Sequence, residues 1–192
     1  MLQPGKLFHP LGLTEGIARC AELPFASGGN SAICLAGSVD ELRDVATVSP
    51  LTVTHSLLAL VQTGGRRPTG ADRDRLWRVF QVPLFEVVYT DDGQLLAHEC
   101  LVGAHLHSAP GLQWRVDAQS GELVATRPRR WFKSAAILAT GFPGSIVELP
   151  CPCGAPGILL DLEPRTCAAA AASSRAAGLS AAQTVLGLGP QS

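Results

Sequence analysis

The sequence predicts a mixed α/β fold whose second half consists mostly of β-strands. Two patterns support this prediction: a capped amphipathic helix at 69–80, and short apolar runs separated by glycine and polar turns after it. The chain has 192 residues, of which 46% are hydrophobic and 16% charged, so it can bury one core. We expect an N-terminal extension or partial subdomain at 1–50, the main α/β domain at 51–165, and an Ala/Ser/Gly-rich tail at 166–192.

Composition and charge exclude several classes of protein. The chain has fifteen basic and sixteen acidic residues, which give a formal net charge of -1 and are mixed along its length, so we expect no nucleic-acid partner. Its first residues lack the apolar core of a signal peptide, and no window of about eighteen apolar residues could span a membrane. We therefore expect a cytoplasmic protein whose six cysteines are metal ligands or free thiols rather than disulfides.

The first sixty residues give weak signals for secondary structure. Thr14 is placed to cap a short helix at 14–22. Residues 31–38 are typical of a short buried strand, and 39–44 of one or two helical turns. The segment 51–62 is apolar and β-branched at its start, but its period does not distinguish a strand from a helix.

The helix at 69–80 has the clearest pattern in the chain. Thr69 is a good N-cap, and Leu76, Val79 and Phe80 form an apolar stripe on one face. Val82-Pro83 ends the helix, because proline cannot continue it.

A β-hairpin follows this helix. Residues 84–89 predict a strand that turns at Asp91-Asp92-Gly93 into a second strand at 94–100. Further strands are predicted at 112–116, 122–126, 134–139 and 146–149. After Cys167 the alanine-rich tail favours helix, but its amphipathic pattern is weak.

Four residues have the chemistry of a structural zinc site. The knuckle Cys151-Pro152-Cys153-Gly154 places two thiols on a tight turn, and Cys100 with His107 offers a second half-site. Three thiolates and one imidazole fill the tetrahedron that zinc prefers and leave no position for water.

Other interpretations of these residues remain open. A close pair of thiols such as Cys151 and Cys153 can also be redox-active. An isolated cysteine is often a small buried hydrophobe, and an isolated histidine often lies on the surface. His105 competes with His107 as the fourth ligand. The remaining cysteines have no comparable partners and are interpreted as buried free thiols: Cys20, Cys34 and Cys167.

A series of short motifs runs from residue 51 to about 160. In order, they are Gly64-Gly65 with the Arg-rich helix after it, Phe80-Gln81-Val82-Pro83-Leu84-Phe85-Glu86, Ala97-His98-Glu99-Cys100, Leu106-His107, Gly121-Glu122-Leu123-Val124 and Cys151-Pro152-Cys153-Gly154. With these motifs the segment resembles the later part of the large domain of phenylacetate-CoA ligases and related adenylate-forming enzymes, the AMP-forming acyl-CoA synthetase superfamily. The resemblance implies a fragment of that large domain with a β-rich, zinc-bearing second half. It also implies that Cys100, His107, Cys151 and Cys153 hold structural zinc.

The chain departs from this family at the positions that bind nucleotide. No Ser/Thr/Gly-rich phosphate loop precedes residue 51, and 88–93 lacks the glutamate that holds magnesium, leaving Asp91 or Asp92 as turn residues or shifted substitutes. The ribose-binding aspartate aligns with Phe142, whose ring cannot accept hydrogen bonds. The residues after 160 are also too few for the mobile domain that carries the family's catalytic lysine.

These departures favour a non-catalytic, zinc-stabilised binding or interaction module, a pseudoenzyme that pairs with itself or with another protein. One alternative is a protein that binds an aryl, acyl or acyl-CoA ligand, or an enzyme that acts on one. Such a protein would use a remnant pocket and nearby cations for an anionic group: Phe85, Val88 and Trp131, with Arg129, Arg130 or Lys133. A further alternative is a zinc hydrolase, which requires that His107 does not bind and that Glu99 lies beside the metal.

Overall fold

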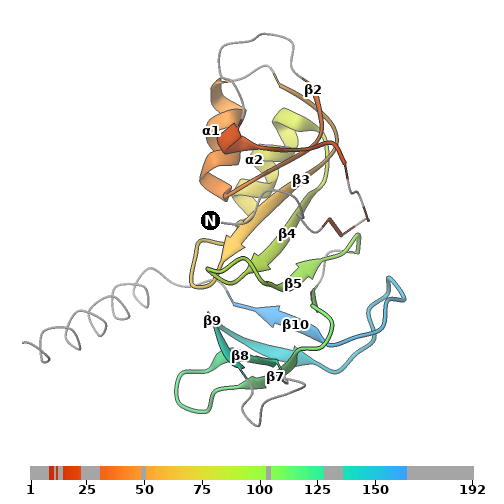
Figure 1. The fold of residues 1–192 in the computed structure, drawn as a ribbon. Helices are drawn as coiled ribbons and strands as arrows, with labels where there is room; N and C mark the ends of the chain where they lie inside the picture. Colours follow the sequence, from red (N-terminus) through yellow and green to blue (C-terminus); the bar gives the residue numbers. More distant parts are fainter. Residues whose placement is uncertain are drawn as a thin grey trace, which may run out of the picture.

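The computed structural model describes residues 9–10, 12, 15–22, 31–48, 51–102, 105–127 and 136–163. In this part of the chain the strands form one large mixed sheet, and two α-helices cover one face of its first half (Figure 1). The mixed α/β class predicted from the sequence is therefore present. None of the helices in these ranges is long and apolar enough to cross a membrane.

The first half of the sheet is parallel. Its elements are β1 (Ile17–Arg19), the 3-10 helix η1 (Cys20–Glu22), β2 (Ser31–Gly37), α1 (Val39–Val48), β3 (Thr52–Gln62), α2 (Gly70–Phe80) and β4 (Leu84–Tyr89). Strands β1 to β4 lie side by side in chain order, and each pairing between them is parallel. Parallel neighbours need a crossover connection, and α1 and α2 provide those between β2 and β3 and between β3 and β4.

Helix α2 begins as the sequence predicts. The hydroxyl of Thr69 accepts a hydrogen bond from the Asp72 N–H (3.2 Å), and the Asp72 carboxylate accepts one from the Thr69 N–H (2.9 Å), which completes a capping box. Leu76 and Phe80 are buried, as predicted. Val79 is 48% exposed instead, because the helix buries only the narrow row of positions i and i+4.

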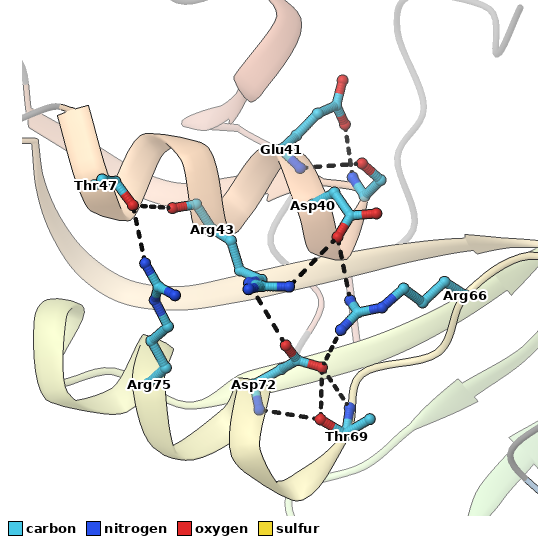
Figure 2. Close-up of polar contacts among 9 residues, drawn as sticks. Asp40, Glu41, Arg43, Thr47, Arg66, Thr69, Asp72 and Arg75 are labelled. Carbon is cyan, nitrogen blue, oxygen red and sulfur yellow. Dashed lines mark hydrogen bonds and ion pairs between the residues drawn. The ribbon is translucent and has the colours of Figure 1, made fainter.

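A charged network joins α1 to α2 (Figure 2). The Asp72 carboxylate accepts a hydrogen bond from Arg66 (2.7 Å) and lies 3.8 Å from Arg43, and both arginines also pair with Asp40. Burial raises the pKa of Asp72, but hydrogen bonds from Thr69 and Arg66 outweigh it and lower this pKa to about 2. The two helices are thus held together by charge as well as by apolar packing.

The second half of the sheet is antiparallel. Its strands are β5 (Leu95–Glu99), β6 (Leu106–Ser108), β7 (Gln113–Val116), β8 (Glu122–Arg127), β9 (Ala136–Val147) and β10 (Leu159–Leu162). The order across the sheet continues β4-β5-β6-β10-β9-β8-β7, so β10 lies between β6 and β9. In Figure 1 this half lies below the two helices.

The buried side chains form three clusters. One lies between the parallel strands and the two helices, and includes Leu35, Leu42 and Leu76. Another occupies the opposite face of β2, β3 and β4. The third lies mainly in the antiparallel half, where it includes Phe142 and Leu160, and it extends to Val61 of β3 and Val88 of β4. The core under the two helices is therefore distinct from the core of the antiparallel half.

Several predicted elements are confirmed. Residues 31–38 form β2, the helical turns at 39–44 extend into the longer α1, and the hairpin of β4 and β5 turns at Asp91-Asp92-Gly93. The ambiguous segment 51–62 is a strand, β3, paired in parallel on both sides.

Other predictions are wrong. The helix expected at 14–22 is replaced in the described residues by β1 and η1, because Ile17–Arg19 pairs with β2 as an edge strand. The two strands expected at 134–139 and 146–149 are one strand, β9, whose partners β8 and β10 cover different lengths of it. The short strands β6 and β10 were not predicted. The tail at 166–192 lies outside the described residues.

Candidate metal centre

Four metal-binding side chains come together where β5, β6 and β10 meet. Cys100 follows the last residue of β5, His107 is the middle residue of β6, and Cys151 and Cys153 lie between β9 and β10. Strand β6 pairs with β5 on one side and with β10 on the other, which brings the three segments together. These are the four residues that the sequence predicts.

Two separations in this cluster match those expected in a tetrahedral site. The sulfur atoms of Cys100 and Cys151 are 3.6 Å apart, and the sulfur of Cys153 is 3.4 Å from Nε2 of His107. All four ligand atoms lie within 4.8 Å of one another. Zinc bonds of about 2.3 Å to sulfur and about 2.0 Å to nitrogen place two sulfurs about 3.8 Å apart and a sulfur and a nitrogen about 3.5 Å apart. The cluster can therefore hold a metal ion, and the separation of the sulfurs is far from the ~2.05 Å of a disulfide.

The loop with two cysteines is shaped to present both thiols. The N–H of Gly154 donates to the carbonyl of Cys151 (3.0 Å), and Gly154 has a φ of 76° in the left-handed region that favours glycine. The N–H of Ala155 donates to the sulfur of Cys153 (3.4 Å). His107 and Cys151 are buried, Cys100 is partly buried and Cys153 is the most exposed of the four, so the centre lies near the surface.

The protonation of the ligands favours metal binding at one thiol and at the imidazole. The N–H of Ala155 lowers the pKa of Cys153, and burial lowers the pKa of His107, whose neutral ring is the form that binds metal. The N–H of Cys153 also lowers the pKa of Cys151, but burial and the neighbouring thiols of Cys153 and Cys100 outweigh it and raise that pKa to about 11. A bound cation is what would keep all three sulfurs ionised.

The two other histidines near the centre have different surroundings. His98 is the strand partner of His107, and their rings stack with centroids 5.6 Å apart and planes 14° apart. His105, the alternative ligand, is not in the cluster. Its Nδ1 is buried without a hydrogen-bond partner in the described structure, and the residue is among those that line a small cavity of about 80 Å³. His107 is therefore the imidazole that the structure brings to the cysteines.

Glu99 does not face the metal centre. Side chains alternate between the two faces of a strand, so Glu99 and its partner Leu106 lie on the face opposite to His98 and His107. The Glu99 carboxylate accepts hydrogen bonds from Arg73 (2.8 Å) and from the N–H of Glu86 (2.9 Å). Burial raises its pKa, against the opposing effect of Arg73. The ion pair occupies this carboxylate and keeps it from acting as a base beside a metal.

Of the residues predicted for an acyl pocket, the structure describes Phe85 and Val88, and both lie in the core. They are 3% and 1% exposed and belong to two core clusters.

Asp91 and Asp92 are turn residues whose carboxylates accept hydrogen bonds from Thr63 and Thr90. Several predicted residues lie outside the described part of the chain: Arg129, Arg130, Trp131, Lys133 and Cys167.

Two described cysteines lie outside the cluster, Cys20 and Cys34. Cys20 and Cys34 are buried free thiols, as predicted. Burial and the nearby Glu41 carboxylate raise the pKa of Cys20 to about 12, which leaves it protonated and unreactive.

A larger cavity of about 480 Å³ lies at the carboxyl ends of the parallel strands. It is lined by residues from the ends of β1 and β3 and from the junction of β2 with α1, among them Arg19, Ala36, Ser38, Val39, Leu60 and Arg66. The carboxylate of Asp40 pairs with Arg66, and that of Glu41 accepts a hydrogen bond from the N–H of Ser38. No local sequence pattern predicts this cavity, because its walls come from segments that meet only in the folded sheet.

Comparison with known proteins gives a likeness of fold only. No family model matches the sequence, and no curated protein matches it. Among solved structures, an open conformation of 2-hydroxyisobutyryl-CoA ligase, in complex with 2-HIB-AMP and CoA, superposes with a TM-score of 0.52 at 13% sequence identity. The match covers 83% of this chain and 53% of the ligase chain, so this chain spans about half of the ligase's length.

Proposed function

We propose that this chain is a zinc-stabilised module with the fold of an adenylate-forming ligase, which acts by binding rather than by adenylation. The observation that carries this proposal is the Cys3His cluster, whose separations of 3.6 Å and 3.4 Å suit a four-coordinate metal. Thiolates with one imidazole favour zinc over oxygen-seeking cations such as magnesium. Four protein ligands leave no position for an activated water, so the metal's role is structural.

Metal analysis tests the site directly. Mass spectrometry of the untagged wild-type protein, purified without added metal, should give one zinc per chain. The variants Cys100→Ser, His107→Gln, Cys151→Ser and Cys153→Ser should each lose it. His105→Gln is the matched control and should keep the metal, because His105 lies outside the cluster. Wild-type protein without metal would contradict the proposal.

The nucleotide-binding positions support a role other than adenylation. Phe142, which stands where the resembling family has its ribose-binding aspartate, is fully buried in the core of the antiparallel half. Asp91 and Asp92 are engaged in the turn between β4 and β5. We therefore expect no ATP–pyrophosphate exchange above background with a panel of aryl and acyl acids. Exchange that depends on one of these acids would show that the chain is an active ligase.

The cavity of about 480 Å³ favours a second candidate, the binding of a small acyl or aryl anion. Its volume lies in the range of ligand pockets, roughly 300–1,000 Å³, and open α/β sheets bind ligands at the carboxyl ends of their strands. Arg19 offers a cation there, with apolar walls from Val39 and Leu60. Hexanoate or benzoate should raise the melting temperature of the wild-type protein and not that of Arg19→Gln. Equal shifts in both proteins would exclude this pocket.

A further inference from the structure

The residue before the first cysteine ligand is anchored to helix α2. Arg73 donates from Nη2 to the Glu99 carboxylate (2.8 Å) and from Nη1 to the carbonyl of Leu84 (3.0 Å). The same oxygen of Glu99 also accepts the N–H of Glu86 (2.9 Å). The side chain of Glu99 is 9% exposed and that of Arg73 is 33% exposed, so the carboxylate end of this ion pair is shielded from solvent.

A second arginine extends this network to β10. Glu86, which is 1% exposed, accepts hydrogen bonds from Nε (2.6 Å) and Nη2 (3.1 Å) of Arg67. Arg67 also donates to the carbonyl of Leu162, at the end of β10. The network therefore contacts β4, β5 and β10. Strand β5 leads into Cys100, and β10 follows the loop that carries the other two cysteines.

Cys100 depends on this anchor because the sheet does not hold it. The last paired residue of β5 is Glu99, opposite Leu106. Cys100 is followed by Leu101 and Val102, which are 68% and 47% exposed at a turn. Beyond Glu99, then, no strand pairing fixes the direction in which the chain carries the Cys100 thiol.

We propose that Arg73 is the positioning residue of the metal centre. By holding Glu99 against β4, it fixes the position of the Cys100 thiolate. Metal affinity therefore depends on how α2 packs against the sheet. This inference rests on the proposed zinc site and deepens it. Residues outside the coordination sphere that orient metal ligands commonly change metal affinity by about 10- to 100-fold when they are replaced.

The test compares two arginines of the same helix. Arg73→Gln removes the contact to Glu99, whereas Arg75→Gln removes only an exposed hydrogen bond to Thr47 (3.1 Å). Zinc affinity is measured on each full chain by competition with a chromophoric chelator, well below the melting temperature. We expect Arg73→Gln to bind zinc about 10- to 100-fold more weakly than the wild type, and Arg75→Gln to bind it as the wild type does.

A cobalt spectrum separates positioning from loss of stability. Cobalt(II) in place of zinc gives a thiolate charge-transfer band whose intensity depends on how the sulfurs approach the metal. Arg73→Gln should weaken this band at saturating cobalt, and Arg73→Lys, which restores the charge but not the two-pronged contact, should recover part of the affinity. A wild-type spectrum and affinity in Arg73→Gln would overturn the proposal.

Glu99→Gln gives an independent measurement if Arg73→Gln does not fold. It keeps the size of the side chain and an acceptor for the Glu86 N–H, and it should weaken zinc binding by a similar factor. The zinc affinity of the double variant should fall by less than the two single fold-losses multiplied together, because both substitutions remove the same contact. The inference would be contradicted if Glu99→Gln bound zinc as tightly as the wild type, or if the two fold-losses in zinc affinity multiplied in the double variant. A wild-type chain that binds no zinc would instead reject the proposed function.

Discussion

Phe142 is a core residue, at the position that the motif resemblance aligned with a ribose-binding aspartate. It is 0% exposed and lies among the buried side chains of the antiparallel half. Its N–H donates to the hydroxyl of Thr140 (3.1 Å), which in turn donates to the carbonyl of Leu123 (2.7 Å). The side chain at 142 therefore points into packed apolar surroundings, and these have no room for a solvated carboxylate.

An aspartate placed at position 142 should destabilise the fold and should not give nucleotide binding. Phe142→Asp loses the buried ring, which alone costs about 3–5 kcal/mol, and buries a carboxylate without a partner. Urea denaturation should show a severe loss of unfolding free energy, and calorimetry should show no ATP binding. Phe142→Leu, which keeps an apolar side chain, should cost much less. An aspartate variant that is stable and binds ATP would contradict this assignment.

Gly144 allows β9 and β10 to approach each other closely. A Cβ atom at this position would lie 2.3 Å from the carbonyl oxygen of Asp161, which is backbone and cannot move aside. Gly144→Ala should therefore lower the unfolding free energy by about 2 kcal/mol or more. Gly70→Ala is the matched control: nothing lies within 4 Å of its added carbon, and alanine in a helix should be neutral or stabilise by up to about 1 kcal/mol. Thermal denaturation of both variants measures this difference.

At the scale of elements, a charged network adds to the apolar packing between α1 and α2. Asp72 belongs to the cap of α2 and to the network that reaches Arg43 on α1 (Figure 2). Its partners are more exposed than it is, since the side chains of Arg43 and Arg66 are 38% and 40% exposed and that of Asp72 is 7% exposed. The carboxylate is thus the buried centre of an otherwise solvated network.

The lowered pKa of Asp72 predicts a specific loss of stability in acid. Its pKa is about 2 in the folded chain against 3.8 ordinarily, so the unfolded chain binds the proton more readily. The stabilisation is present above about pH 4 and is lost as the pH falls toward about 2. After allowance for solvent screening it amounts to about 1–2 kcal/mol.

Asp72→Asn removes the charge but keeps an acceptor for the helix cap. Its unfolding free energy should lie below that of the wild type at pH 7, and the difference should shrink as the pH falls through this window. Urea denaturation at several pH values measures both. A difference that does not change with pH would show that the charge of Asp72 is not what joins the helices.

Long elements with local signals could be predicted from the sequence, whereas short strands could not. Helix α2 could be predicted from its N-cap, Thr69, and from the spacing of its buried residues Leu76 and Phe80. The hairpin of β4 and β5 could be predicted from its Asp-Asp-Gly turn. Strands β6 and β10 have only three and four residues, and distant pairing partners stabilise them. The sequence predicts two strands in place of β9, because Gly141, Pro143 and Gly144 suggest a turn between them. In the structure, Gly144 instead allows close packing against β10.

The same distinction applies to the candidate metal centre. The types and order of its four candidate ligands could be found in the sequence, because cysteine and histidine are rare and these lie in recognisable motifs. Arg73, His98 and Glu86 could not be linked to the centre, since their contacts depend on strand register and on where α2 lies. Register is set by pairing across the sheet and cannot be read from one strand alone.

At the scale of the whole molecule, the two halves have different supports. The parallel half has two helices and its own core, whereas the candidate metal centre joins β5, β6 and the loop before β10 in the antiparallel half. Because the affinity of a structural metal is folding free energy, loss of the ion should loosen the antiparallel half first.

Hydrogen exchange with and without a chelator measures this difference. Excess chelator should speed amide exchange in Leu95–Glu99, Leu106–Ser108 and Leu159–Leu162 by about tenfold or more, and leave exchange in α1 and β3 nearly unchanged. The control is His105→Gln, which should respond as the wild type does. Uniform acceleration along the chain would mean that both halves unfold as one unit.

The position of β10 in the sheet bears on how the chain emerges from the ribosome. Leu159–Leu162 is the last strand of the described chain, but it lies between β6 and β9. During synthesis the parallel half can form before β10 is available. Until then, β6 and β9 each have an edge with unpaired N–H and C=O groups. A nascent chain that stalls before Leu159 exposes both edges at once. Once these four residues have left the ribosome and paired, the edges of β6 and β9 are covered, and β1 and β7 are the edge strands of the described sheet.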